Sequence, residues 1–168
     1  MRLAVALLLL AAMPASAQSR ADAAEAEGRF VRALTAVAIE DFETARRSLD
    51  AVLEAAPGDV TVLTLRAEVA TAMDAPADAV FFARRATEAA PDRAEAWLAF
   101  ATALRDARQP AEAASVIDRA RTLSPADPDV LALSADLAAE RGDAAAERDA
   151  LAALVREGDT VAARLRLS

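Results

Sequence analysis

The chain of 168 residues contains 50 alanines, five phenylalanines, one tryptophan and no tyrosine, and its formal net charge is −8 at pH 7. It also lacks cysteine, histidine and lysine, so all 19 basic residues are arginines. These absences exclude disulfides and most nucleophiles and general bases, and 27 acidic residues disfavour nucleic acid as a partner. The abundance of alanine, with only four glycines, favours closely packed helices over a turn-rich β fold.

The N-terminal segment, from Met1 to Ala17, has the pattern of a secretory signal. Arg2 precedes an unbroken apolar run from Leu3 to Ala12, and small residues surround a cleavage site after Ala17. A membrane-spanning helix needs about 20 apolar residues, and this run is half that length. We therefore expect residues 1–17 to be cleaved, leaving a domain of residues 18–168 with no membrane span and a net charge of −9, because Arg2 is lost.

The amino acids that are missing also bear on the source of the chain. Lysine, asparagine and tyrosine are all absent, and they share AT-rich codons. Their absence indicates a GC-rich bacterial genome. A bacterial signal peptide predicts a periplasmic protein, with secretion as the second choice.

Prolines and alanines recur at a constant interval along the chain. Pro57, Pro91 and Pro125 are evenly spaced. Two alanine columns keep the same step: Ala33, Ala67, Ala101 and Ala135, and then Ala45, Ala79 and Ala113. Several independent columns in one register indicate four tandem repeats. Their approximate bounds are 26–59, 60–93, 94–127 and 128–161.

Each repeat is predicted to hold two helices, because proline and aspartate mark their starts and ends. The first helices are expected at about Arg20–Ala38, Val60–Met73, Arg93–Ala107 and Pro128–Arg141. The second helices are expected at Phe42–Ala56, Pro76–Ala90, Pro110–Ser124 and Asp143–Glu157, followed by a short capping helix at Thr160–Leu167. The expected helix caps are Asp59, Asp92, Asp127 and Asp143.

This pattern resembles the tetratricopeptide repeat (TPR) family, whose 34-residue signature combines large residues, small contact residues and a closing proline. The third repeat fits best, with Trp97, Phe100, Ala101, Leu104, Ala113, Ile117, Ala120 and Pro125. The resemblance implies an all-α fold: a right-handed α-solenoid of about four helix-turn-helix repeats, with first helices on the concave face. Trp97 is then a packing residue. Arg29 and Arg32 replace usual apolar residues in the first repeat, which leaves the phase of that helix open.

The resemblance further implies a protein–protein interaction module, such as a periplasmic adaptor or assembly factor that holds a partner's peptide in its concave groove. The implied groove residues are Phe30, Leu34, Thr61, Thr64, Glu68, Thr71, Glu95, Leu98, Thr102, Arg105, Asp129, Asp136 and Glu140. Because acids outnumber bases in this set, we expect a basic or apolar-basic protein or peptide partner. One TPR subclass clamps acidic peptides with Lys, Arg and Asn, but Thr64, Glu68, Leu98 and Thr102 stand at those positions, which rejects that role.

Other functions are weaker interpretations of the same residues. A self-associating scaffold or subunit of a cell-envelope complex, hence a homo-oligomer, stays an alternative. A carboxylate-based glycan hydrolase is a remote one, because a short solenoid rarely builds a deep pocket. We expect no enzyme, no catalytic residue and no cofactor.

Two charged clusters have ordinary structural explanations. The acidic run from Asp127 to Asp129, with Asp136 and Glu140, lacks the glycine turn of a calcium loop, so helix capping is preferred to a metal site. Arginines on the second helices alternate with acids, which predicts a mixed solvated face rather than a basic patch. The arginines are Arg46, Arg47, Arg84, Arg85, Arg119 and Arg121.

Overall fold

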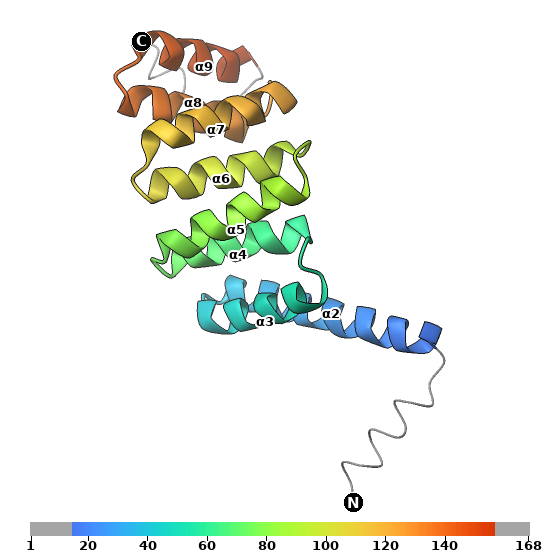
Figure 1. Cartoon of the computed structure of the whole chain (residues 1–168). Helices are drawn as coiled ribbons and strands as arrows, with labels where there is room; N and C mark the ends of the chain where they lie inside the picture. The colour runs from blue at the N-terminus through green and yellow to red at the C-terminus, as the bar shows by residue number, and fades with distance from the viewer. Residues whose placement is uncertain (1–14, 157–168) are drawn as a thin grey trace, which may run out of the picture. The chain divides into compact units, whose positions relative to one another are not determined.

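The computed structural model describes residues 15–156, with side chains from residue 23 onward, and this part of the chain forms eight helices (Figure 1). The helices are α2 (Ala15–Ala38), α3 (Phe42–Ala55), α4 (Val60–Ala72), α5 (Pro76–Ala89), α6 (Ala94–Asp106), α7 (Pro110–Leu123), α8 (Pro128–Glu140) and α9 (Ala144–Arg156). They fall into two compact units, Met1–Pro57 with α2 and α3, and Gly58–Ser168 with α4 to α9. Most of the expected signal, residues 1–14, and the expected capping helix at Thr160–Leu167 lie outside the described residues.

The helix bounds follow local sequence signals closely. Except for α2, which begins at Ala15 rather than Arg20, each helix begins and ends within one residue of its predicted position. Pro76 and Pro110 occupy first turns, where a missing N–H costs no hydrogen bond. The paired helix-turn-helix arrangement and the all-α class are therefore confirmed.

Three of the four expected aspartate caps are confirmed. The backbone N–H of Val62 donates to Asp59 at 3.1 Å, that of Val130 to Asp127 at 3.2 Å, and that of Ala146 to Asp143 at 3.1 Å. The prediction for Asp92 is wrong. Helix α6 begins at Ala94, so the cap position belongs to Arg93, whose side chain accepts no such bond.

The first helix of every pair is followed by a residue whose backbone is in the left-handed region. These residues recur at the same interval as the prolines. The residues are Glu40 (φ 59°), Asp74 (φ 54°), Arg108 (φ 62°) and Gly142 (φ 72°). In the third pair, the N–H of Gln109 donates to the carbonyl of Leu104 at 2.9 Å, which reverses the chain in a Schellman-type turn. Sequence reasoning missed this column because only one of its four members is glycine.

Within the unit Gly58–Ser168, three helix pairs stack so that α4 contacts α6 and α6 contacts α8. Ala67, Ala101 and Ala135 are 0–3% exposed, so small side chains let the helix backbones approach. Trp97 is half-buried against the core and its indole N–H donates to the carbonyl of Pro91 at 3.0 Å. Its expected packing role is confirmed.

In the unit Met1–Pro57, α2 packs against α3. Ala33 and Ala45 are fully buried, as are the alanines that occupy the same columns in later repeats. The repeat register therefore runs unchanged through α2, and no phase shift accompanies Arg29 and Arg32.

Candidate functional site

Helices α4 and α6 form a pocket of about 240 Å³ within the second unit. Its lining residues recur at intervals of three and four along each helix, so they share one face. From α4 they are Thr64, Ala67, Glu68 and Thr71, and from α6 they are Glu95, Leu98, Ala99, Thr102 and Ala103. The lining is mostly apolar surface, and it includes no arginine.

Two of the three threonines of this pocket, Thr64 and Thr102, offer acceptors rather than donors. The hydroxyl of Thr102 donates to the carbonyl of Leu98 at 2.9 Å, and the hydroxyl of Thr64 donates to the carbonyl of Val60. Both protons are therefore used within the helix, while the hydroxyl oxygens can still accept. Together with two carboxylates, the pocket suits a ligand that carries an apolar group and hydrogen-bond donors.

Glu68 is the carboxylate most affected by this environment. Glu68 is exposed by its surface area, but the protein around it partly desolvates the carboxylate and raises the pKa of Glu68, because burial disfavours the charged form. Glu95 stands across the same pocket on α6 and is exposed. A cation bound between the two helices would offset the desolvation of Glu68, so the pocket favours positive charge.

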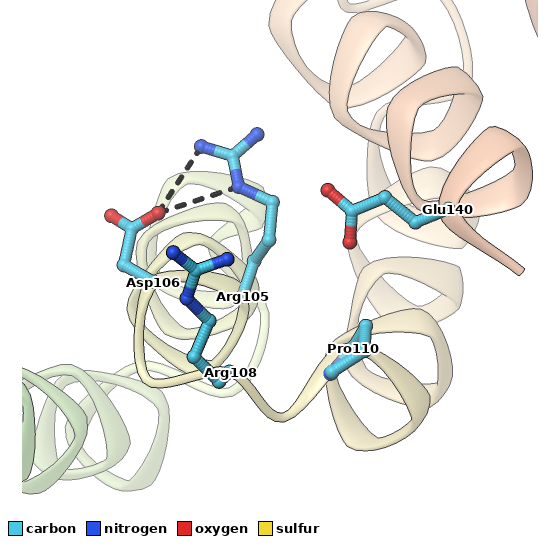
Figure 2. A pocket seen from close by; sticks show the side chains of 5 residues that line it. All are labelled: Arg105, Asp106, Arg108, Pro110 and Glu140. Carbon is cyan, nitrogen blue, oxygen red and sulfur yellow. Dashed lines mark hydrogen bonds and ion pairs between the residues drawn. The ribbon is translucent and has the colours of Figure 1, made fainter.

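A second pocket, of about 450 Å³, lies where α6 ends and faces α8 (Figure 2). Arg105 points into it, with Nε 3.4 Å from Asp106 Oδ1 and Nη1 3.8 Å from Asp136 Oδ2. Glu140 enters from α8 on the opposite side, and Arg108 lies at the loop after α6. Acids and bases balance here, so this pocket has no strong preference for either charge.

Comparisons with known proteins agree with this architecture. Residues 94–137 match the Tetratricopeptide repeat family. The paired helices form a TPR-like fold. No curated protein matches the chain by sequence.

Solved structures are similar over most of this chain. The MamA protein is 18% identical, over 80% of this chain and 73% of its own, with a TM-score of 0.71. YrrB, described as a TPR protein with an unusual peptide-binding site, is 17% identical over 86% and 75%, with a TM-score of 0.71. The first TPR of Spaghetti (RPAP3), bound to the HSP90 peptide SRMEEVD, is 14% identical over 70% and 96%, with a TM-score of 0.66.

Some of the residues expected to line the groove lie together in the structure. Six of the expected residues line the pocket between α4 and α6: Thr64, Glu68, Thr71, Glu95, Leu98 and Thr102. Arg105 and Glu140 line the second pocket, and Asp136 pairs with Arg105. Thr61 and Asp129 are exposed near the starts of α4 and α8 and line neither pocket.

Two other expected groove residues belong to the first unit. Phe30 is half-buried on α2, and Leu34 on the same helix is 45% exposed. Neither is among the lining residues of the two pockets above.

Sequence reasoning missed several lining residues. They are Ala67, Ala99, Ala103, Asp106, Arg108 and Pro110. Ala99 and Ala103 follow Glu95 at four-residue steps, so a helical-face pattern was available. An alanine column, however, indicates close packing and a groove floor equally well.

The mixed charged face on the second helices is confirmed where ion pairs are present. Arg46 Nη2 lies 2.7 Å from Glu43, and its Nη1 lies 3.2 Å from Asp50. Arg121 Nη1 lies 3.8 Å from Asp118. These acids lie one turn from their arginines, so the arginines do not form an uncompensated basic patch.

No helix within residues 15–156 is both long and apolar enough to cross a bilayer. Among the acidic side chains that the structure describes, no three or more come together as potential metal ligands. Asp127 accepts from the backbone of Asp129 at 2.9 Å, as expected for a capping residue.

Proposed function

We propose that this TPR protein is an adaptor or assembly factor that holds a short segment of a partner protein in the pocket between α4 and α6. The observation that carries the proposal is the chemistry of that pocket. It combines apolar surface with polar groups that accept hydrogen bonds, and Glu68 and Glu95 supply negative charge. A segment with Lys or Arg beside one or two apolar anchors matches this arrangement.

The structural neighbours support peptide binding as the general mode. YrrB is described by its peptide-binding site, and the RPAP3 domain was solved with a bound peptide. The RPAP3 peptide contains three acidic residues, whereas the present pocket lacks an arginine and carries two carboxylates. For this chain a basic segment is therefore the better electrostatic match.

A role without catalysis is part of the proposal. TPR proteins are typically scaffolds rather than enzymes, and the sequence contains no histidine, cysteine or lysine to act as a base or nucleophile. The proposed place of action is the periplasm. The apolar run from Leu3 to Ala12 and the small residue Ala17 support export.

A binding assay with matched charge reversals tests the proposal. Fluorescently labelled peptides containing a Leu–Arg pair, a Leu–Glu pair or a Leu–Gln pair would be titrated with the protein, with anisotropy as the readout. We expect the basic peptide to bind best, and more weakly as salt rises. Glu68→Arg should weaken its binding about tenfold or more, since a favourable charge becomes a repulsive one.

The control is Glu88→Arg, which makes the same charge change at an exposed position on α5. It should leave affinity within about twofold, because only long-range screened charge is altered. Equal losses in the two variants would show that net charge, and not the pocket, controls binding. Tighter binding of the acidic peptide would contradict the proposal directly.

One observation favours the scaffold alternative. Val31, Leu34 and Ile39, in and just after α2, are 54%, 45% and 70% exposed. Exposed large apolar side chains close together are typical of association surfaces. Sedimentation velocity over a hundredfold concentration range separates the two proposals. An adaptor stays monomeric without its partner, whereas a scaffold self-associates as its concentration rises. The double substitution Val31→Ser and Ile39→Ser should then abolish this self-association.

A further inference from the structure

Arg32 and Arg66 occupy equivalent positions in the first and second repeats, but their surroundings differ. In the second repeat Arg66 is only 4% exposed, and its guanidinium carbon lies 4.4 Å from the centroid of the Phe82 ring. Its Nη2 also lies 3.9 Å from Asp78 Oδ2. An aromatic ring and a carboxylate therefore occupy the space around this arginine.

The equivalent positions of the first repeat hold smaller and uncharged partners. Arg32 takes the place of Arg66, while Ser48 and Thr44 stand where the ring and the carboxylate would be. Between α2 and α3, within the first unit, there is an open surface depression of about 250 Å³, which is called the cavity below. Its lining is Arg29, Arg32, Thr44, Arg47, Ser48 and Ala51.

Two of these three arginines already contact neighbouring residues, on their own helix and, for Arg29, also on α3. Arg29 Nη2 lies 2.6 Å from Glu25, and its Nη1 donates to the carbonyl of Ala51 at 3.4 Å. Arg47 Nε lies 3.6 Å from Glu43. Both acids lie outside the lining, and each guanidinium has five N–H donors, so these contacts use only part of the capacity.

Arg32 is the third arginine, and it is exposed on α2. Within the part of the chain that the structure describes, its guanidinium forms no hydrogen bond or ion pair. The wall thus includes three arginines, a threonine and a serine and no carboxylate, and the acids that pair with Arg29 and Arg47 lie beside it. Such a wall is rich in donors and positive charge, and is suited to an anion rather than a metal ion.

We propose that this cavity binds a phosphoryl group, either as free phosphate or as a phosphate monoester. The planar arginine fork donates paired hydrogen bonds to phosphate oxygens, and the hydroxyl of Ser48 can donate as well. A phosphate carries between about 1.5 and 2 negative charges near pH 7 and several acceptor oxygens. A singly charged, planar carboxylate uses fewer of the donors, so phosphate is the better match.

This site lies between a different pair of helices from the proposed peptide pocket and does not depend on it. It also explains why Arg29 occupies a column that holds Leu63 and Leu131 in other repeats, both at most 2% exposed. At those positions leucine fills the packing space. In the first repeat the same column supplies a donor to the cavity.

Isothermal titration calorimetry on the full chain tests the proposal, with sodium phosphate, glycerol 3-phosphate and sodium acetate at constant ionic strength. We expect one phosphate or one glycerol 3-phosphate to bind per chain. Acetate should bind at least about tenfold more weakly than either. Tighter binding of glycerol 3-phosphate would support the site as one for a monoester, and tighter binding of phosphate as one for the free ion. No binding of either at millimolar concentration, or acetate binding as tightly, would overturn the proposal.

Variants connect the binding to this cavity. Arg32→Gln removes the one guanidinium of the cavity wall that has no partner among the described residues. It should weaken phosphate binding about tenfold or more, because hydrogen bonds to charged groups are strong. The control Arg119→Gln changes an exposed arginine on α7 and should leave binding unchanged. Ser48→Phe rebuilds the arrangement of the second repeat and should abolish binding with the helical circular dichroism signal retained. Unchanged phosphate binding in Arg32→Gln would overturn the proposal even if Ser48→Phe failed to fold.

Discussion

The guanidinium of Arg66 is almost completely buried and lies 4.4 Å from the centre of the Phe82 ring. A buried arginine is costly unless its charge is compensated, and the ring face supplies a favourable electrostatic contact while excluding water. Phe81, the preceding residue, meets Phe82 edge-to-face with ring centres 5.1 Å apart, yet is itself 55% exposed. Two adjacent aromatics on α5 thus have different roles.

The first prediction compares these two aromatics. Phe82→Ala should lower the free energy of unfolding by about 2–4 kcal/mol, because it removes apolar packing and also the ring that compensates the buried charge of Arg66. Phe81→Ala should cost less than about 1 kcal/mol, since more than half of its surface is already in water. Urea unfolding followed by circular dichroism measures both. Equal costs would mean that the ring of Phe82 does not protect Arg66.

The second prediction concerns the alanine column. Ala101 is fully buried, so Ala101→Leu forces extra carbons between packed helices and should cost about 1–3 kcal/mol. The matched control Ala111→Leu makes the same change at an exposed position on α7 and should change stability by less than about 0.5 kcal/mol. Thermal and urea unfolding would check the pair. A greater loss at Ala111 would be incompatible with the repeat register.

The third prediction uses the left-handed turn positions. Glu40 has φ 59°, where a side chain is strained, so Glu40→Gly should raise stability by about 0.5–1 kcal/mol. At Gly142, with φ 72°, the reverse change Gly142→Ala should lower stability by about 1 kcal/mol, although an added Cβ would meet no atom within 4 Å. Urea unfolding of both variants tests whether backbone strain is the cause. Stability changes of the same sign in both variants would exclude backbone strain as the cause.

The fourth prediction concerns the pH dependence due to Glu68. Because burial raises its pKa above the ordinary 4.5, the ionised carboxylate is destabilising in the folded state. This penalty is absent below pH 4.5 and grows as pH rises through the raised pKa. Glu68→Gln should therefore be more stable than the wild type at pH 7, by less than about 1 kcal/mol because the group is partly solvated, and the difference should vanish at low pH.

Unfolding curves at several pH values measure this difference. A stability difference for Glu68→Gln that grows as the pH falls would have the wrong sign for a carboxylate with a raised pKa.

The fifth prediction concerns export. If residues 1–17 are a signal, the mature protein begins at Gln18 and osmotic shock releases it from the periplasm. Ala17→Phe should block processing, because signal peptidase accepts only small residues at this site. N-terminal sequencing and fractionation provide the readout. A membrane-retained protein that keeps Met1 would contradict the expectation.

Much of the candidate site could be predicted because both helices that form it have regular spacing. Thr64 and Glu68 lie one turn apart on α4, as Leu98 and Thr102 do on α6, and all four line one pocket. Thr61 and Asp129 fit the same pattern, but they lie near helix starts and do not line that pocket. The pattern determines a helix face, whereas the depth of a pocket depends on where the neighbouring helix crosses that face.

The sequence by itself determined the elements and their repeat. Proline and aspartate act within a few residues of their own position, so Pro76, Pro110, Asp59 and Asp127 mark helix starts without reference to the rest of the chain. The alanine columns likewise predict which faces pack. Only the tertiary structure decided the environments of the arginines. Arg66 is covered by Phe82 while Arg32 borders a cavity beside Ser48, because burial and charge compensation depend on the size of side chains from a neighbouring helix, which local sequence signals do not specify.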